Sequence, residues 1–459
     1  MDEKHLARMI FRCVDKFGGR TAMKYRTDEM WISVTWNSMG ERIKACAKAL
    51  VESGIQEGDR IGIFADNCPE WAIADFSIMS VGAISVPIAA VESAAEAERI
   101  VNHAGIKLLF TGDAAQYEKA LSFYYASDYL QKIVIFSKNA AADDNPHALY
   151  FQDFIEMGRR SRRDDAVHAR MEHVSTDDFA TLIYTPGTGG ESKGIILTHA
   201  NLFHQIDSLQ RLHPVREDDV SFCYLPLTRA LERTWSYYIF YQGATNCYCP
   251  DRRRVYECLP QVQPTCMAVT PSFFEKLYPA LNEKIKGSPA PLRGILEWAR
   301  TTGVIAAKIL KDGMRFKLGI KIRMRLSHMA LKKLVRQSLG ENMRYFICGG
   351  DFLPAVVEEF FLAAGVPVYQ GYGLKEASPM VTINCPEDYM PGTAGKPLPE
   401  CDVRIADDGE ILVGGPNVMK GYYRTSGRSA EAFGEGWIRT GDIGELDNGY
   451  LRVLGRKMT

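Results

Sequence analysis

The sequence has no apolar run of the roughly 20 residues that a helix needs to cross a bilayer. Its first residues, Met1 to His5, begin acidic and lead into no apolar core, so they do not resemble a secretory signal. We therefore predict neither a membrane-spanning helix nor an export signal in this sequence. We therefore expect a cytoplasmic protein, with peripheral contact as the only kind of membrane contact.

Cysteine pairs with the spacing of a metal or redox site are also missing. The 11 cysteines are scattered, no CxxC motif occurs, and one residue separates the closest two, Cys247 and Cys249. A zinc site is therefore not predicted. We expect free, buried thiols in a reducing compartment.

Neither sign of charge is in excess. The 55 basic and 56 acidic residues give a formal net charge of -1, which offers no general attraction to nucleic acid or to an anionic membrane. Residues 280–340 are the exception, because they are basic and follow a helical pattern. We interpret this stretch as a solvated helical face, with contact to acidic lipid or to CoA phosphates as the alternative.

Strands and helices alternate along the first part of the chain. A strand at Arg60–Asp66, a helix that begins at Pro69 and a strand at Ile84–Pro87 form a βαβ unit, which implies a parallel sheet. Strands of the same kind are predicted at Ile106–Thr111, Lys132–Phe136 and Phe179–Tyr184. From Thr393 onward, Gly, Pro, Asp and Asn separate short strands, which is typical of a β-rich subdomain.

The chain of 459 residues exceeds the usual size of one domain, roughly 100–200 residues, so several subdomains are expected. We predict an α/β fold of two stacked α/β subdomains with mainly parallel sheets, plus a small β-rich subdomain that forms a distorted barrel. The expected ranges are about 1–190, 191–379 and 380–455.

The strongest local motif reads YTPGTGGESKG from Tyr184 to Gly194 and directly follows a predicted strand. Glycines let backbone N–H groups approach an anion, hydroxyls add donors, and Lys193 adds a positive charge. The motif is not a Walker loop, because Ser192 and Gly194 stand where that loop has Gly and Ser or Thr. Ser192 also replaces the third glycine of a dinucleotide fingerprint. Spacing alone favours a phosphate loop and a flexible surface turn equally.

This segment resembles the phosphate loop of adenylate-forming enzymes, the superfamily of acyl-CoA synthetases, luciferases and peptide-synthetase adenylation domains. The family pattern is YTSGTTGxPKG, from which Pro186, Gly189 and Ser192 depart. The resemblance implies that Thr188 and Lys193 are catalytic. It implies ATP contacts for Thr185, Gly187, Thr188, Gly189, Gly190 and Lys193.

Further segments match the same family in the family's order. Residues 225–235 resemble the family pattern LPLxHxFERTW, and residues 271–276 resemble the pattern PRxxEK. Residues 348–353 resemble SGGAPL, and residues 370–376 resemble QGYGxTE. The fifth match is the segment GWIRTGDIG at 436–444. Because five matches follow in order, the resemblance covers nearly the whole chain. It implies that Tyr372 stacks on adenine, that Asp442 accepts hydrogen bonds from both ribose hydroxyls, and that Glu376 is a catalytic residue. The remaining residues with an implied nucleotide contact are Gly349, Gly350, Asp351, Gln370, Gly371, Gly373, Lys375 and Arg456.

Two further roles follow from the resemblance. Glu376 and Thr188 are the implied ligands of Mg²⁺. Arg229 stands where the family has a His near the reacting carboxylate, so we expect Arg229 to be catalytic.

The 225–235 segment and Glu297-Trp298-Ala299 resemble the long-chain branch of the family. The resemblance therefore implies a ligase that uses ATP and Mg²⁺ to convert a medium- to long-chain fatty acid to an acyl-adenylate and then to an acyl-CoA. The expected partners are fatty acid, ATP and CoA, and not nucleic acid. The oligomeric state is left open, with a homodimer as one option.

Several departures from the family fall on motif positions, namely Pro186, Gly189, Arg229, Ser272 and Lys375. They leave two alternatives open: a weakened or inactive protein that binds adenylate or an acyl chain, and an acyl-AMP ligase that uses a carrier protein. In the family, a hinge at the position of Thr459 leads into a small C-terminal domain that supplies a lysine. We therefore expect the 459 residues alone to be a poor ligase.

Overall fold

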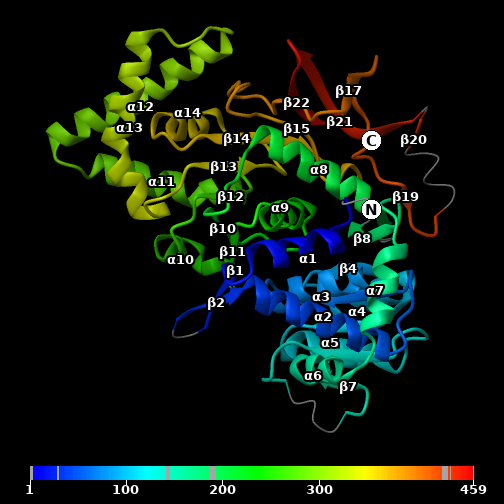
Figure 1. The fold of residues 1–459 in the computed structure, drawn as a ribbon. Helices are drawn as coiled ribbons and strands as arrows, with labels where there is room; N and C mark the ends of the chain where they lie inside the picture. The colour runs from blue at the N-terminus through cyan, green and yellow to red at the C-terminus, as the bar shows by residue number, and fades with distance from the viewer. Residues whose placement is uncertain are drawn as a thin grey trace. The chain divides into compact units, whose positions relative to one another are not determined.

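The computed structural model describes residues 4–27, 30–140, 145–185, 193–249, 251–425, 433–434 and 436–457 (Figure 1). The chain forms two compact units, which are described separately. Unit 1 comprises residues 1–206, 226–250 and 419–431, and unit 2 comprises residues 207–225, 251–418 and 432–459.

Unit 1 is built on a mainly parallel sheet with the strand order β19-β9-β8-β4-β3-β5-β6-β7. β3, β4, β5, β6 and β7 pair in parallel, and β8 pairs in parallel with β4. β9 and β19 are added antiparallel at the edge. The bounds are β3 (Arg60–Phe64), β4 (Ile84–Ile88), β5 (Ile106–Thr111), β6 (Lys132–Ile135), β7 (Ala148–Tyr150), β8 (Phe179–Thr185), β9 (Lys193–Thr198) and β19 (Gly421–Tyr422).

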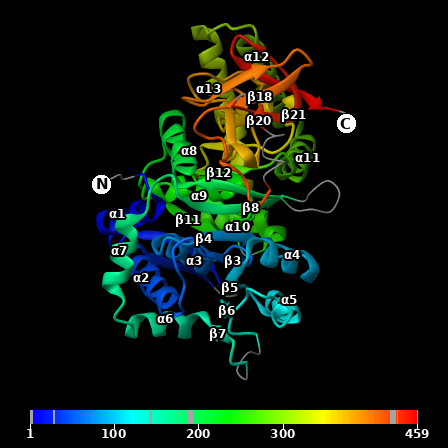
Figure 2. The ribbon, with the colours of Figure 1, turned by 90° about the vertical axis from the view of Figure 1, so that its right-hand side faces the viewer.

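Helices cover both faces of this sheet. Figure 2 shows α2 and α6 on one side of β3, β5 and β6, with α4 and α5 on the other. Every residue of α3 except Glu70 is buried, and its Pro69 stands in the first turn, where a missing N–H costs nothing. The bounds are α1 (Leu6–Phe17), α2 (Trp36–Glu52), α3 (Pro69–Ser80), α4 (Ala94–Ala104), α5 (Ala114–Tyr124), α6 (Phe151–Arg160), α7 (Asp164–His173), α8 (His199–Leu212) and α9 (Ala230–Tyr241).

Unit 1 also contains β1 (Thr21–Arg26), which pairs antiparallel with β2 (Trp31–Thr35) and parallel with β11 (Thr245–Tyr248). The apolar core of the sheet that contains β3, β4 and β5 joins Phe64, Val86 and Leu109 from its strands to Ile100 and Tyr117 from α4 and α5. The alternation of apolar strands and amphipathic helices therefore closes one core between sheet and helices.

Unit 2 carries a second sheet, whose strands run in the order β16-β15-β14-β13-β12-β10 within this unit. β10, β12, β13 and β14 are parallel, and β15 and β16 are antiparallel. The strand bounds are β10 (Val220–Cys223), β12 (Cys266–Val269), β13 (Tyr345–Cys348), β14 (Val368–Gly373), β15 (Met380–Ile383) and β16 (Lys396–Pro397). The helices of unit 2 are η1 (Arg252–Arg254), α10 (Val255–Val262), α11 (Ser272–Lys286), α12 (Ala290–Lys311), α13 (Leu318–Leu339), α14 (Ala355–Ala363) and η2 (Lys375–Ala377).

A small antiparallel sheet completes unit 2. It consists of β17 (Asp402–Ile405), β18 (Glu410–Gly414), β20 (Phe433–Gly434), β21 (Trp437–Asp447) and β22 (Tyr450–Arg456). Its inner face buries Ile411, Val413 and Leu451 against Val381 of β15 and Ala377 of η2. Tyr372 packs against this apolar cluster, so the cluster fixes the end of β14 that carries the tyrosine.

The predicted α/β class with two mainly parallel sheets and a small β-rich part is confirmed. The predicted subdomain boundaries at 190 and 379 stay predictions. All 11 cysteines are free, and ten of them are buried, as expected. Among the described residues, no helix is both long enough and apolar enough to pass through a bilayer.

Candidate functional site

Tyr372 and Asp442, which the sequence places 70 residues apart, are in contact in unit 2. The Tyr372 hydroxyl donates a hydrogen bond of 2.7 Å to Oδ2 of Asp442. Tyr372 lies near the end of β14, and Asp442 lies in the middle of β21. Burial raises the pKa of Tyr372, and the bond to Asp442 raises it further, so the phenol stays a protonated donor.

The backbone around Asp442 is fixed by its own neighbours. The Asp442 N–H donates to Oγ1 of Thr440 at 3.1 Å, and the Thr440 hydroxyl donates to the Ile411 carbonyl at 2.8 Å. The Gly441 N–H donates to a carboxylate oxygen of Glu410 at 3.0 Å. Asp442 therefore presents its carboxylate from a segment that β18 holds in place on the β17–β22 sheet.

Arg456 lies directly across from Asp442 in the pairing of β22 with β21. Its side chain is exposed, and Asp442 is half-buried. A carboxylate has about four lone-pair positions, and the Tyr372 hydroxyl occupies one of them. The remaining positions suit a ligand with two neighbouring hydroxyl groups.

The glycines of the 370–373 segment have a packing role in the structure. A Cβ on Gly373 would lie 1.9 Å from the Pro379 carbonyl oxygen, and one on Gly371 would lie 2.7 Å from the Thr382 oxygen. Only glycine lets β14 approach β15 and the residue before it this closely. Contact of Gly371 and Gly373 with nucleotide stays a prediction.

Gln370 precedes these glycines and is buried. Among the described residues, its Oε1 has no hydrogen-bond partner, whereas its backbone carbonyl accepts from Asn384 at 2.9 Å. An unpaired buried acceptor costs about 1–3 kcal/mol. A ligand or a water molecule that donates to this oxygen would remove that cost.

The turn after β13 carries Gly349, Gly350 and Asp351. Gly350 has φ of 95°, a region that favours glycine. Oδ1 of Asp351 accepts from the Phe352 N–H at 2.7 Å, and the Phe352 ring is 63% exposed. The turn therefore presents backbone groups and an aromatic ring at the surface of unit 2.

Lys375 and Glu376 form the single turn of η2, and both are half-buried. In the part of the chain that the structure describes, no group of three or more His, Cys, Asp and Glu side chains could hold a metal ion. Mg²⁺ at a nucleotide site is commonly held by one or two carboxylates together with substrate phosphates and water. Glu376 fits that donor set as its single carboxylate.

Lys193 and Thr185 flank the glycine-rich segment in unit 1. They are opposite residues of the antiparallel β8–β9 pair, so the segment 186–192 joins two neighbouring strands. Nζ of Lys193 lies 5.1 Å from the centre of the Tyr422 ring, a cation–π contact with β19. The predicted contacts Gly187, Thr188, Gly189 and Gly190 lie outside the described residues.

The base of this hairpin has supports that sequence reasoning missed. Nδ1 of His103 in α4 lies 2.7 Å from the Tyr184 hydroxyl, and the His103 carbonyl accepts from Arg424 at 3.0 Å. The Tyr423 N–H donates to the Gly194 carbonyl at 2.7 Å. Tyr423, Arg424 and His103 belong to no motif of the sequence, so no local signal marks them.

Arg229 is the N-terminal flanking residue of α9 and is exposed. One turn later, Arg233 is buried and forms an ion pair with Asp75 of α3. Tyr237 donates to Asp75 at 2.6 Å, and Arg233 donates to Thr181 at 2.8 Å. This buried network fixes the start of α9 and thereby the position of Arg229.

Comparison with known proteins identifies the family. The model of the family described as AMP-binding enzyme matches residues 10–423. The chain belongs to this family. Among the residues predicted to contact nucleotide, Tyr372 bonds Asp442 in unit 2, and Thr185 and Lys193 face each other on paired strands in unit 1.

Two relatives of this AMP-binding enzyme are named for their activities. The long-chain-fatty-acid–CoA ligase FadD15 of Mycobacterium bovis is 34% identical over 437 residues, which cover 94% of this chain and 70% of the relative. The chloroplastic long-chain-fatty-acid–[acyl-carrier-protein] ligase AEE15 of Arabidopsis thaliana is 28% identical over 474 residues, covering 94% of this chain and 65% of the relative.

The fold agrees with solved structures. The crystal structure of the N-terminal domain of FACL13 from Mycobacterium tuberculosis superposes with a TM-score of 0.72 at 21% identity. The match covers 98% of this chain and 99% of that chain. At this identity the likeness bears on the fold alone.

Proposed function

We propose that this AMP-binding enzyme activates a medium- to long-chain fatty acid with ATP, through an acyl-adenylate, and transfers the acyl group to CoA. The observation that carries the proposal is the 2.7 Å bond between Tyr372 and Asp442, which unites two family motifs in one polar pair. The 34% identity to FadD15 supports the long-chain substrate class.

The nucleoside is assigned to residues of unit 2. Asp442 accepts the ribose hydroxyls on the oxygen positions that Tyr372 leaves open, and the Tyr372 ring offers an aromatic face to adenine. The Gln370 oxygen and the 349–351 turn complete the predicted adenine and phosphate-side contacts. Arg456 and Lys375 add positive charge near a polyanionic ligand.

The phosphates are assigned to Lys193, Thr185 and the 187–190 segment of unit 1. A lysine at the end of a glycine-rich connection supplies a charge, and backbone N–H groups supply directional donors. Mg²⁺, when bound with ATP, would be held by Glu376 and Thr188 and would neutralise phosphate charge. Arg229 is proposed to orient the fatty carboxylate.

The proposed reaction has two steps. In the first, a carboxylate oxygen of the fatty acid attacks the α-phosphorus, an acyl–phosphate bond forms, and the bond to pyrophosphate breaks. In the second, the CoA thiolate attacks the acyl carbon, a thioester forms, and AMP leaves. The protein's part in both steps is to position reactants and to stabilise charge, which is how phosphoryl transfer is generally catalysed.

A carrier protein is a second candidate acceptor. AEE15, at 28% identity, acts by its name on an acyl-carrier protein. CoA and the phosphopantetheine arm of a carrier present the same thiol, so the first step is common to both. A direct competition between CoA and a holo acyl-carrier protein as acceptors of the palmitoyl group decides between them.

The test of the proposed function is binding of a stable acyl-adenylate analogue, palmitoyl-sulfamoyl-adenosine, by calorimetry. Because intermediate analogues commonly bind at least about 100-fold more tightly than a substrate fragment, we expect at least that margin over AMP. Palmitate-dependent exchange of labelled pyrophosphate into ATP is the catalytic readout. Equal affinity for AMP and the analogue, with no exchange on any fatty acid from C8 to C18, would contradict ligase activity.

We also propose that the protein meets its apolar substrate at membranes by peripheral contact. A medium- to long-chain fatty acid partitions into bilayers because each buried methylene contributes roughly 0.8 kcal/mol. Sedimentation of the protein with lipid vesicles tests this contact.

A further inference from the structure

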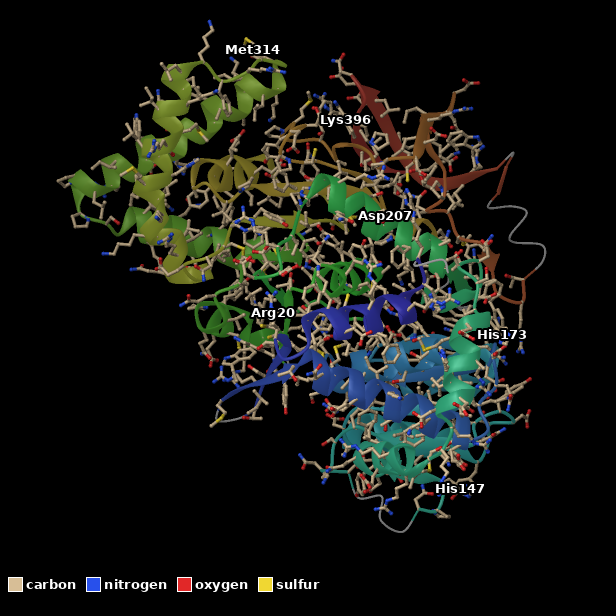
Figure 3. All side chains as sticks on the ribbon, viewed as in Figure 1. Arg20, His147, His173, Asp207, Met314 and Lys396 are labelled. Carbon is tan, nitrogen blue, oxygen red and sulfur yellow. The ribbon has the colours of Figure 1, made fainter. Side chains whose placement is uncertain are left out.

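The helices α12 and α13 form an antiparallel pair that is anchored to the rest of unit 2. The Ser327 hydroxyl bonds the carbonyls of Ala299 in α12 and Ala363 in α14 at 3.1 and 2.9 Å. Arg323 donates to Thr302 at 2.9 Å. Met314 lies in the connection between the two helices, and Figure 3 shows its side chain at the outer end of the pair. The pair is therefore a fixed projection of unit 2.

α13 has apolar residues on two opposite sides. One side is buried and contains Met324, Leu331, Val335 and Leu339. The other side is exposed: Leu318, Ile322, Leu326 and Met329 have exposed fractions of 74%, 54%, 51% and 66%. We name these four residues the α13 stripe. Their spacing of three or four residues places them on one face of the helix.

A single large apolar residue at the surface is ordinary, but an aligned row of four is not. Met314, which is 52% exposed, extends the apolar surface to the connection before α13. A row of this kind at a fixed surface indicates a partner that covers apolar atoms.

The charge around the stripe has one sign. Residues 313–340 contain eight Lys or Arg and no Asp or Glu, although the whole chain has a net charge of -1. Lys321, Arg325 and Lys332 precede or follow stripe residues by one to four positions, so they flank it on the helix. In the part of the chain that the structure describes, none of these three forms an ion pair.

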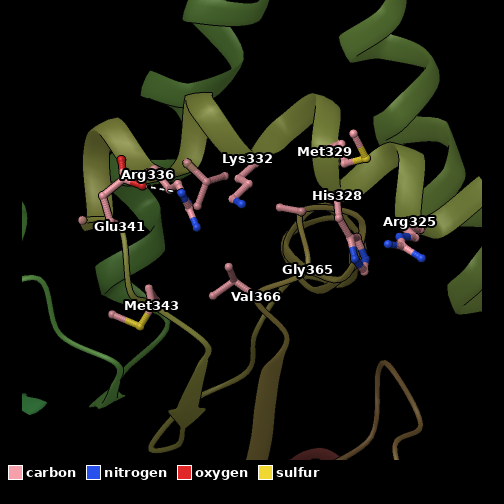
Figure 4. A pocket seen from close by; sticks show the side chains of 12 residues that line it. Arg325, His328, Met329, Lys332, Arg336, Glu341, Met343, Gly365 and Val366 are labelled. Carbon is pink, nitrogen blue, oxygen red and sulfur yellow. Dashed lines mark hydrogen bonds and ion pairs between the residues drawn. The ribbon is translucent and has the colours of Figure 1, made fainter. Parts of the chain in front are cut away.

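A pocket of about 280 Å³ adjoins the C-terminal half of the stripe. Met329, Arg325, Lys332 and Arg336 line it from α13, and Val366 lines the opposite wall. Figure 4 shows Lys332 and Arg336 reaching from α13 toward Val366. Its wall thus joins cationic and apolar side chains at the point where the stripe ends, together with Glu341, which forms an ion pair with Arg336.

We propose that α13 is a docking surface for an anionic phospholipid bilayer. The α13 stripe enters the boundary between headgroups and acyl chains, Lys321, Arg325 and Lys332 contact lipid phosphates, and the pocket beside Arg336 takes one headgroup. This inference deepens the peripheral contact proposed above by naming its surface and lipid class. It uses none of the residues assigned to ATP, so it does not depend on ligase activity.

The two sets of residues select this partner over others. A nucleic acid would satisfy the basic residues but would leave the stripe in water. A second copy of the same face would cover the stripe but would bring Lys321, Arg325 and Lys332 against the same three cations. An interfacial helix with an apolar row and flanking Lys and Arg satisfies both sets at an anionic lipid surface.

The test measures partition of the 459-residue protein onto vesicles without ATP, CoA or fatty acid. We expect binding to vesicles of phosphatidylcholine with about 30% phosphatidylglycerol. Binding to phosphatidylcholine alone should be at least about tenfold weaker, because each basic residue near an anionic surface raises the affinity about fivefold. The triple variant K321E/R325E/K332E should lose on the order of 100-fold. No binding of the unchanged protein to the anionic vesicles would overturn the proposal.

A matched charge control is K138E/R159E/R162E in unit 1, where all three residues are exposed. It changes the net charge equally, and we expect it to lose less than about threefold. An equal loss in both triple variants would mean that overall charge, and not α13, controls binding, and would overturn the assignment. Circular dichroism melting of each variant keeps unfolding separate from loss of binding.

The stripe has its own pair of variants. I322D/L326D should weaken binding by at least about tenfold, whereas V91D/Y125D, at residues 73% and 77% exposed, should leave it unchanged. If I322D/L326D instead changes the sedimentation coefficient and leaves vesicle binding intact, the stripe is a self-association face. If inorganic phosphate binds at the pocket while vesicles do not, the pocket is an anion site and the docking proposal is wrong.

A failure of this proposal is distinguishable from a failure of the proposed function. Vesicle binding is read without any ligase substrate, and binding of the acyl-adenylate analogue is read without vesicles. K321E/R325E/K332E should bind the analogue as the unchanged protein does. Loss of analogue binding in this variant would contradict the separation of the two surfaces.

Discussion

The Tyr372 hydroxyl donates to Asp442 at 2.7 Å, so the aromatic residue of one family motif orients the carboxylate of another. The bond uses one carboxylate oxygen and leaves the acceptor positions that a ribose would need. It also restricts rotation of the Asp442 side chain before a ligand arrives. Preorganisation of this kind raises affinity because less freedom is lost on binding.

Tyr372→Phe should therefore weaken AMP binding by about 10- to 100-fold while the ring remains in place, because a hydrogen bond to a charged group contributes about 1.5–3 kcal/mol. Calorimetry with AMP measures the change. Tyr450→Phe is the matched control. Tyr450 lies on β22, and its hydroxyl donates a hydrogen bond of 3.4 Å to Asp388. An equal loss in both variants would point to a general effect on the β-rich part.

The same pair predicts non-additivity. Asp442→Asn should weaken AMP binding more than Tyr372→Phe does, and the double variant should lose less than the sum. We expect a coupling energy of about 1 kcal/mol, as is usual for residues in direct contact. Additive losses would show that the 2.7 Å bond has no influence on nucleotide binding.

Lys193→Ala should reduce affinity for ATP at least about tenfold more than affinity for AMP. Lys193 ends the connection that corresponds to the family's phosphate loop, and a charge placed there acts on the β- and γ-phosphates that AMP lacks. Lys420→Ala is the control, because Lys420 pairs with Asp177 at the surface of the same unit. Equal losses for ATP and AMP would contradict the role of Lys193.

The sequence predicted the local elements better than their long-range contacts. The strand at Ile106–Thr111 has the predicted bounds, and the helix begins at Pro69 as predicted, because apolar runs and a proline in the first turn are local signals. The pairing of β19 with β9 joins residues more than 200 positions apart. No local pattern encodes such a pairing.

The candidate site divides in the same way. Tyr372 and Asp442 could be named from motifs, but their bond could not, since it depends on how β14 and β21 meet. The pairing of Arg233 with Asp75 spans 158 residues and was missed altogether. The sequence showed that residues 280–340 are basic and predicted that they are helical. Only the structure shows which apolar residues of α13 are exposed.

The buried pair of Arg233 and Asp75 predicts a large effect on stability. Arg233→Met should lower the free energy of unfolding of the domain by about 3–5 kcal/mol, because Asp75 would keep a buried charge without its partner. Both side chains are at most 3% exposed. Urea denaturation followed by tryptophan fluorescence measures the loss.

An exposed ion pair provides the comparison. Lys44 and Asp164 lie 2.9 Å apart with exposed fractions of 57% and 47%, and Lys44→Met should cost no more than about 1 kcal/mol. A similar loss of unfolding free energy at the two sites would contradict the prediction, because it would mean that Asp75 is not left as an unpaired buried charge.

Glu358 in α14 predicts a dependence of stability on pH. Burial raises the pKa of Glu358 to about 8, and its Oε2 accepts a hydrogen bond from the Gly392 N–H at 2.7 Å. The folded state therefore holds a proton that the unfolded chain releases near pH 4.5. The stability that this group contributes is fully present below that pH, and it is lost as the pH rises toward 8.

Glu358→Gln keeps an oxygen that can accept from Gly392 and removes the titration. Relative to this variant, the unchanged protein should lose up to about 1.4 kcal/mol of unfolding free energy per pH unit between about pH 5 and pH 8. Urea denaturation at intervals of half a pH unit gives the two curves. Glu359→Gln at the neighbouring position, where the side chain lies 4.0 Å from Lys311, is the control and should run parallel to the unchanged protein. If the Glu358→Gln curve is also parallel, Glu358 ionises in the folded protein as it does in the unfolded chain, and this prediction is wrong.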